Sequence, residues 1–135
     1  MNHWLLKSDP DTYSFDDLER DRRTVWDGVR NNQALIYLRR MKRGDSAFVY
    51  HSGRDKAVVG LAAIVRGAYP DPKLDDEKLV VVEVSFGRRL PDPVTLTQIK
   101  RDPLFRDFLL VRNSRLSVMP VPPALWKMLE SMGGL

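Results

Sequence analysis

Two segments of the chain combine aromatic rings with side chains that both donate and accept hydrogen bonds. Residues 26–34 begin with a tryptophan and continue through a glycine, an arginine, two asparagines and a glutamine. Residues 44–52 end in a tyrosine, a histidine and a serine. An aromatic face stacks on other flat rings, and a carboxamide presents a donor beside an acceptor. The two segments therefore predict a pocket for a flat polar ring.

Trp26 is the candidate stacking surface of the first segment. A stacked aromatic contributes roughly 1–3 kcal/mol to the binding of a flat base, so one indole in the right place is enough to matter. The alternative is a core indole, which is the more frequent role of an isolated tryptophan. The glycine and the asparagines that follow Trp26 favour the pocket.

The amides Asn31, Asn32 and Gln33 are candidates for reading the polar edge of the ring. A carboxamide can pair with an exocyclic amine and with the ring atom beside it. The alternative is helix capping, and we expect one of the two asparagines to serve only as a cap.

Arg30 and Asp27 lie between the tryptophan and the amides. Arg30 can bind a phosphate, or it can orient this loop through Asp27. The alternative is a surface ion pair between the two, which contributes only about 0–1 kcal/mol.

The second segment ends in Tyr50, His51 and Ser52, where a predicted strand runs into a hairpin. Alternation along a strand places Tyr50 and Ser52 on one side and His51 on the other. Only a bend or a β-bulge would turn all three toward one cavity. For His51 the alternative is a hydrogen-bonded structural imidazole.

Two further polar groups flank these segments. Lys7 and Ser8 end the first predicted strand and offer backbone groups and a phosphate contact, the alternative being a plain strand end. Ser114, Arg115 and Ser117 belong to a late polar and basic segment, and Ser117 reaches the pocket if its strand pairs beside the strand of Tyr50. The alternative for this segment is a surface loop.

Composition limits the class of protein. The chain has 135 residues, of which 43% are hydrophobic, enough for one domain with its own core. It has no cysteine and two histidines, so disulfides, thiol nucleophiles and a dense metal site find no support, and we expect a soluble cytoplasmic protein. The sequence indicates no membrane segment and no cofactor, and it does not identify a protein partner. A net charge of +4, concentrated in residues 28–43, where no acidic residue occurs, suits an anionic partner or a solvated helix face.

Hydrophobic periodicity and capping residues predict an α+β fold. Ser14, Asn31 or Asn32, and Thr95 are suitable helix caps, and Gly44 is a suitable stop for the second helix. The predicted strands are residues 4–7, 47–51, 57–65, 79–86 and 115–118. The predicted helices or turns are residues 15–20, 32–43, 96–100, 103–109 and 123–132, with a loop at 68–78 and a break at 90–93.

Four motifs, at residues 4–10, 26–34, 44–52 and 116–121, resemble those of the EVE domain family in the right order along nearly the whole chain. EVE domains are similar to PUA and YTH domains. The resemblance implies one domain over residues 1–135, a PUA-like mixed β pseudo-barrel of about five to six strands flanked by helices, and a pocket for a modified nucleobase. The chain departs from the family pattern at Asp9, where glutamate is expected, and at Asn32, where an aromatic residue is frequent.

The resemblance implies a nucleic-acid-binding module that reads a modified base: modified cytosine in DNA, or a methylated base in RNA. Phosphate contacts would come from Arg39, Arg40, Lys42, Arg43 and Arg112. A general RNA-binding barrel without a base pocket is the first alternative. An enzyme is a weaker one, because adjacent residues His51 and Ser52 point to opposite sides of a strand and no nucleophile-elbow sequence is present.

Overall fold

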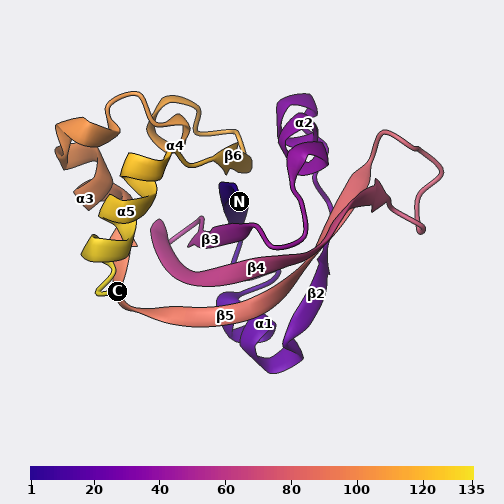
Figure 1. The fold of residues 1–135 in the computed structure, drawn as a ribbon, viewed down its shortest axis with the longest axis horizontal. Coiled ribbons are helices and arrows are strands. Elements are labelled where there is room, and N and C mark those ends of the chain that lie inside the picture. Colours follow the sequence, from indigo (N-terminus) through magenta and orange to yellow (C-terminus); the bar gives the residue numbers. More distant parts are fainter.

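The computed structural model describes residues 1–135, which form a curved mixed β-sheet with helices around it (Figure 1). The strands are β1 (His3–Ser8), β2 (Arg23–Trp26), β3 (Ser46–His51), β4 (Ala57–Pro70), β5 (Val80–Thr95) and β6 (Val118–Pro120). The helices are α1 (Phe15–Asp21), α2 (Asn32–Arg40), α3 (Leu96–Arg101), α4 (Leu109–Arg112) and α5 (Pro123–Met132), with a short 3₁₀ helix, η1 (Pro103–Phe105).

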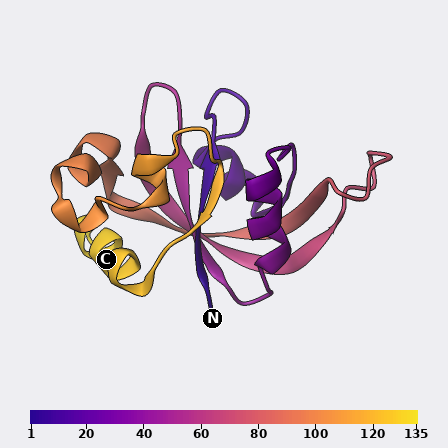
Figure 2. The same ribbon diagram turned by 90° about the horizontal axis from the view of Figure 1, so that it is seen from above.

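The six strands lie in the order β2-β5-β4-β3-β1-β6. β1 and β3 are parallel, and every other neighbouring pair is antiparallel. β2 and β6 are both edge strands, so the sheet is not a closed barrel but an open pseudo-barrel. Figure 2 shows α2 on one side of the central strands and α3 to α5 on the other. The predicted α+β class and strand number are confirmed.

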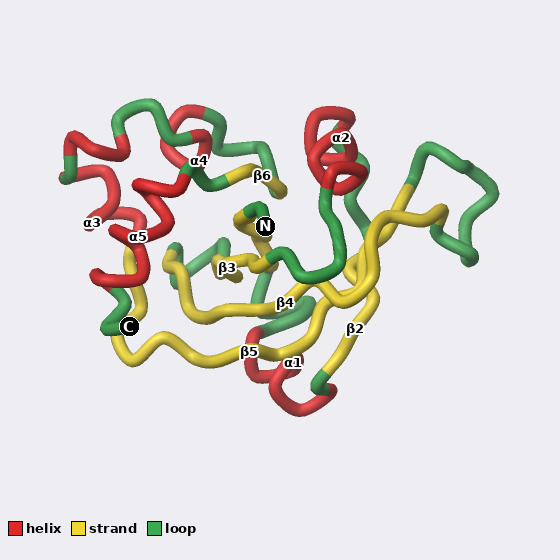
Figure 3. The backbone as a smooth tube through the Cα atoms, in the orientation of Figure 1, coloured by secondary structure: helices red, strands yellow, loops and turns green.

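Curvature comes from the long antiparallel pair β4 and β5, whose register shifts at four places. Gly87 lies at a close approach of the two strands, where a Cβ atom would lie 2.6 Å from the Leu61 carbonyl oxygen. The two strands continue beyond the rest of the sheet, and the loop of residues 71–79 that joins them projects outward (Figure 3).

Local signals placed the starts of α1, α2 and α3 correctly, whereas the predicted turn at 103–109 is divided into η1 and the later helix α4. Ser14 caps α1 and Thr95 caps α3, each in a capping box with the residue three positions later. Asn31 caps α2, since its Oδ1 accepts a hydrogen bond from the Ala34 N–H at 3.0 Å. α2 ends at Arg40, earlier than predicted, because Met41 has an extended backbone.

The strand predictions were wrong in several places. β4 and β5 run to Pro70 and Thr95, beyond the predicted ends at 65 and 86, so the loop between them is shorter than predicted. β2 did not appear among the predicted strands. The last strand is Val118–Pro120, not 115–118. The predicted break at 90–93 lies inside β5, where these residues bulge out between the pairs Gly60–Arg89 and Val58–Val94. The bulge accommodates both prolines without ending the strand, because its residues need no ladder partner.

The core is one cluster of 34 buried hydrophobic residues. Trp4 and Trp126 belong to it. Phe15 at the start of α1 packs directly on Gly60 of β4, where a Cβ atom would overlap its ring. This contact fixes α1, and the loop before it, against the sheet.

The buried carboxylate Asp45 joins three parts of the chain. It accepts hydrogen bonds from the Trp4 Nε1, the Asn2 N–H and the Lys42 N–H at 3.0, 3.1 and 3.0 Å. Burial alone would raise the pKa of Asp45, but these hydrogen bonds outweigh it and lower the pKa below its ordinary value. No helix of the structure combines the length and apolar character required to cross a membrane.

Candidate functional site

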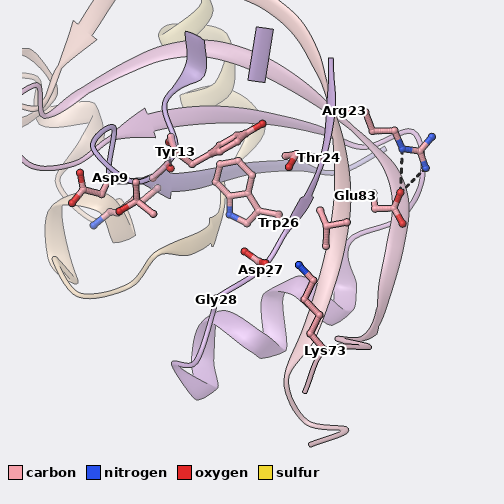
Figure 4. Close-up of a pocket in the computed structure, with 13 residues that line it drawn as sticks. Asp9, Tyr13, Arg23, Thr24, Trp26, Asp27, Gly28, Lys73 and Glu83 are labelled. Atoms are coloured by element: carbon pink, nitrogen blue, oxygen red, sulfur yellow. Dashed lines mark hydrogen bonds and ion pairs between the residues drawn. The ribbon is translucent and has the colours of Figure 1, made fainter. Parts of the chain in front are cut away.

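A pocket with a volume of about 950 Å³ opens between the end of β1, the loop before α1, and β2 (Figure 4). The loop of residues 71–79 and β5 complete its walls with one residue each. The lining residues are Lys7, Ser8, Asp9, Thr12, Tyr13, Arg23, Thr24, Val25, Trp26, Asp27, Gly28, Lys73 and Glu83.

A tight turn after β1 brings Tyr13 to the pocket. The Asp9 carbonyl accepts hydrogen bonds from the backbone N–H groups of Thr12 and Tyr13 at 3.0 and 2.9 Å. The Ser8 hydroxyl donates to the Tyr13 carbonyl. The Tyr13 hydroxyl in turn donates to Asp21 at 2.9 Å, which holds the ring against the pocket wall.

Trp26 lies at the end of β2, where it pairs with Val82 of β5. The Tyr13 ring meets its indole edge-on, with ring centroids 6.3 Å apart and an interplanar angle of 88°. Trp26 is only 8% exposed although it lines the pocket. Tyr13 and Trp26 together make an aromatic wall, which Figure 4 shows beside Thr24 and Asp27.

Two acidic residues of the pocket differ in their partners: Glu83 is paired with arginines, and Asp27 is unpaired. Glu83 accepts hydrogen bonds from Tyr69, Arg23 and Arg66 at 2.7, 2.7 and 3.2 Å. The hydrogen bonds from Tyr69 and Arg23 hold the pKa of Glu83 below its ordinary value. Asp27, by contrast, is exposed and has no hydrogen-bond or ion-pair partner within the protein.

Two lysines border the same space. Burial lowers the pKa of Lys7, whose ammonium donates to the Ser114 carbonyl at 3.0 Å. Lys73 lies in the loop of residues 71–79, where the buried Asp71 accepts its backbone N–H at 2.9 Å. The Lys73 ammonium forms no ion pair and points toward Asp27 in Figure 4.

The structure brings four of the predicted ligand contacts into the pocket lining: Lys7, Ser8, Trp26 and Asp27. The others lie outside that lining: Arg30, Asn31, Asn32, Gln33, Tyr50, His51, Ser52, Ser114, Arg115 and Ser117. The predicted backbone contacts Arg39, Arg40, Lys42, Arg43 and Arg112 are exposed and also lie outside it.

His51 has both ring nitrogens engaged within the protein. Its Nε2 accepts the Phe15 backbone N–H at 3.0 Å, and its Nδ1 lies 3.0 Å from an Asp55 carboxylate oxygen. Because Nε2 is the acceptor, the proton of the neutral ring is on Nδ1 and is donated to Asp55. The imidazole thus ties the end of β3 to the start of α1.

Tyr50 and Ser52, on either side of His51, contact the lining residues Lys7 and Ser8 without lining the pocket themselves. The register of β3 against β4 shifts between Val49 and Tyr50, which is the irregularity that could have turned this strand end toward the pocket. Tyr50 nevertheless stays buried, at 3% exposure. Its ring faces the Lys7 ammonium at 5.8 Å. The Ser52 backbone N–H donates to the Ser8 carbonyl at 3.0 Å.

The late polar segment contacts β1 through its backbone. The Lys7 N–H donates to the Ser117 carbonyl at 2.9 Å, and the Lys7 ammonium donates to the Ser114 carbonyl. Arg115 is exposed, and Arg112 donates to the Arg106 carbonyl at 2.7 Å. This segment therefore positions Lys7, which does line the pocket.

Sequence reasoning missed nine lining residues: Asp9, Thr12, Tyr13, Arg23, Thr24, Val25, Gly28, Lys73 and Glu83. One signal was available, because Glu83 is the only acidic residue within the valine-rich segment 79–86. Tyr13 stands beside the predicted cap Ser14, and nothing in the local pattern separates it from an ordinary loop aromatic.

Comparison with known proteins identifies the family. The family model described as the EVE domain matches residues 2–132. Human thymocyte nuclear protein 1 is 34% identical over 155 residues, which cover 89% of this chain and 68% of that protein.

Solved structures agree along the whole chain. The NMR structure of a Rhodopseudomonas palustris protein superposes with a TM-score of 0.94 at 42% identity, covering 99% of this chain and 94% of that one. A crystal structure of human THYN1 in complex with DNA that contains 5-methylcytosine superposes with a TM-score of 0.91 at 32% identity, covering 100% of this chain and 99% of that one.

Proposed function

We propose that this chain, which belongs to the EVE domain family, binds DNA and reads a modified cytosine in the pocket beside Trp26. The observation that carries the proposal is the aromatic-walled pocket of about 950 Å³, in a fold that superposes along its full length on a protein solved with 5-methylcytosine DNA. The whole chain acts as one EVE domain in this proposal, which its single hydrophobic core supports.

The pocket suits a base that has been turned out of the helix. Proteins that examine one base must unstack it, and they recover that energy through stacking and polar contacts in a fitted cavity. Tyr13 and Trp26 supply the aromatic contacts, while Thr24 and Asp27 supply polar ones.

The cations around the pocket suit the phosphates on either side of an extruded base. Lys73 is exposed and free of ion pairs, and Lys7 is half-buried in the lining. The exposed arginines of α2 and of the segment after it are more distant from the lining, and we assign Arg39, Arg40, Lys42, Arg43 and Arg112 to outer contacts with the DNA backbone.

A binding role without catalysis is part of the proposal. The His51 imidazole is committed to Phe15 and Asp55, so it is not available to activate Ser52. The Ser52 hydroxyl lies 3.4 Å from the Ser8 carbonyl rather than against a base.

The direct test measures fluorescence anisotropy with duplexes that differ only in one 5-methylcytosine or cytosine, and with matched RNA. We expect tighter binding to the 5-methylcytosine duplex and loss of this preference in Trp26→Ala. Truncating a buried tryptophan costs about 3–5 kcal/mol, so Tyr13→Ala serves as a second, less buried variant. Ile36→Ala, an exposed residue of α2 outside the pocket, is the control.

Equal affinity for both duplexes would refute the reader proposal. If that result came with tighter RNA binding and a steep salt dependence, a general RNA-binding role would replace it. Turnover of any oligonucleotide that disappears in His51→Ala, with the fold retained, would instead establish an enzyme.

A further inference from the structure

The indole nitrogen of Trp26 is a hydrogen-bond donor left free at the pocket. Trp26 Nε1 makes no hydrogen bond within the protein, yet it is not among the fully buried side-chain atoms without a partner, of which His3 Nδ1 is the single one. Trp26 Nε1 is therefore accessible from the pocket. The contrast with Trp4 is direct, because the Trp4 Nε1 is bound to Asp45 at 3.0 Å. Figure 4 shows the nitrogen side of the Trp26 ring turned toward Asp27.

An acceptor without a partner stands beside this donor. Asp27 follows Trp26 directly, lines the same pocket and makes neither a hydrogen bond nor an ion pair within the protein. Gly28 has a φ of +77°, a conformation that turns the chain away immediately after Asp27. The strand ends before Asp27, and the Asp27 carboxylate stays in the lining of the pocket.

The exposed fraction of Trp26 indicates how the ring is used. At 8% exposure little of the indole is open to the pocket, and the Tyr13 ring packs against it at an interplanar angle of 88°. Tyr13 is only half-buried and has the more accessible ring. Trp26 therefore offers its N–H more readily than a stacking face.

A donor beside an acceptor matches one kind of base edge. Cytosine presents the ring nitrogen N3, an acceptor, beside the N4 amine, a donor, and adenine presents N1 beside N6 in the same order. Thymine presents the reverse pattern, with a donor at N3 beside an acceptor at O4. Proteins read flipped bases through hydrogen bonds to their Watson–Crick edge, which is where these donors and acceptors lie.

We infer that Trp26 Nε1 and the Asp27 carboxylate select bases with an exocyclic amine next to a ring acceptor, cytosine or adenine over thymine or guanine. This inference rests on the proposed function, since it concerns the same pocket. It adds the class of base that the pocket accepts and names Asp27 as the specificity-determining residue. 5-Methylcytosine and thymine both carry a methyl group on C5. Only the polar edge therefore distinguishes these two bases.

The expected discrimination follows from the two contacts. A good pair of hydrogen bonds to a base edge discriminates by roughly 1–3 kcal/mol, which corresponds to about 5- to 150-fold in affinity. Thymine would lose both contacts and would set its N3–H against the indole N–H. We therefore expect 5-methylcytosine to bind at least tenfold more tightly than thymine at the same position.

The test compares duplexes in which 5-methylcytosine, cytosine or thymine faces an abasic site, so that base pairing does not differ between them. Asp27→Asn replaces a pure acceptor by an amide that can also donate to O4 of thymine. Because Asp27 is exposed and without a partner, this variant keeps the fold. Asp11→Asn, an exposed acid of the preceding loop outside the lining, is the charge-matched control.

We expect the preference for 5-methylcytosine over thymine to fall to within about threefold in Asp27→Asn and to stay at the wild-type value in Asp11→Asn. Trp26→Phe, which keeps an aromatic ring and removes the N–H, should also reduce it. An unchanged preference in Asp27→Asn would overturn the inference.

The same measurement separates the two proposals. A wild-type protein that prefers 5-methylcytosine to cytosine yet binds thymine equally well would overturn the inference and leave the proposed function standing. A wild-type protein that binds 5-methylcytosine and cytosine equally but rejects thymine would overturn the proposed function and support the edge selection.

Discussion

Asp45 offers a quantitative test of how the fold is held together. It is 4% exposed and accepts three hydrogen bonds, from Trp4, Asn2 and Lys42. In Asp45→Ala the Trp4 indole N–H loses its partner inside the core, and the Lys42 N–H loses its partner at a half-buried site. Each unsatisfied donor costs about 1–3 kcal/mol, whereas the Asn2 N–H can turn to water.

Asp45→Ala should therefore lower the free energy of unfolding by about 2–5 kcal/mol. This is a large part of the stability of a typical domain, which is about 5–15 kcal/mol. For a chain of this size each kcal/mol corresponds to roughly 3–5 °C, so the melting temperature should fall by about 6–25 °C.

Asp45→Asn should cost less, because the amide oxygen can keep the bonds from Trp4 and Lys42. This variant has no ionisable carboxyl group at position 45, so comparing it with the wild type isolates the part of the pH dependence of stability that comes from Asp45. The folded protein holds the pKa of Asp45 below the ordinary value of 3.8, so the unfolded chain takes up a proton first as the pH falls. The stabilisation from ionised Asp45 is complete well above pH 3.8 and disappears as the pH falls through the lowered folded pKa.

The assay is urea unfolding of wild type and Asp45→Asn between pH 7 and pH 3. The difference between their free energies of unfolding should be constant down to about pH 5 and should shrink below it. Subtracting the variant removes the contribution of other carboxylates, such as Glu83, whose pKa is also lowered. A difference that does not change with pH would refute the assignment of Asp45 as an ionised hub.

Three further outcomes follow from single contacts. Gly60→Ala should destabilise the protein by about 1–3 kcal/mol in thermal melts, because the new Cβ overlaps the Phe15 ring, and adding Phe15→Leu should recover part of the loss. Asn31→Ala should cost about 1 kcal/mol through the lost cap while the base preference in anisotropy stays unchanged; a lost preference would give Asn31 a ligand contact after all. Lys73→Ala should weaken binding to every oligonucleotide about equally and lower the salt slope by about 1, whereas the distant Lys127→Ala should leave both unchanged.

Features that depend on a few neighbouring residues were predictable from the sequence. The caps Ser14, Asn31 and Thr95 each act on a backbone N–H three residues later, so the local pattern contained all the information. The motif at residues 26–34 likewise predicted Trp26 and Asp27 as pocket residues, because both lie in one short segment.

Features that depend on strand pairing were not predictable in this way. β2 has four residues without an alternating apolar pattern and exists because it pairs with β5. The prolines at 91 and 93 normally end a strand, but the fold passes them in a bulge between two paired stretches. His51 is another case, since its partner is the N–H of Phe15, 36 residues earlier in the chain.

The chain order of motifs was sufficient to assign the family, the fold class and one side of the pocket, since each depends on residue types at short spacing. Which other residues line the pocket is decided by the tertiary structure, which brings separate segments of the chain together. Tyr13 is held there by the turn after β1, Glu83 by the pairing of β2 with β5, and Lys73 by a loop that follows a fourteen-residue strand. The turn that holds Tyr13 is local, but no local pattern records the strand pairing that brings Glu83 and Lys73 to the same pocket, because its hydrogen bonds form only when the sheet is assembled.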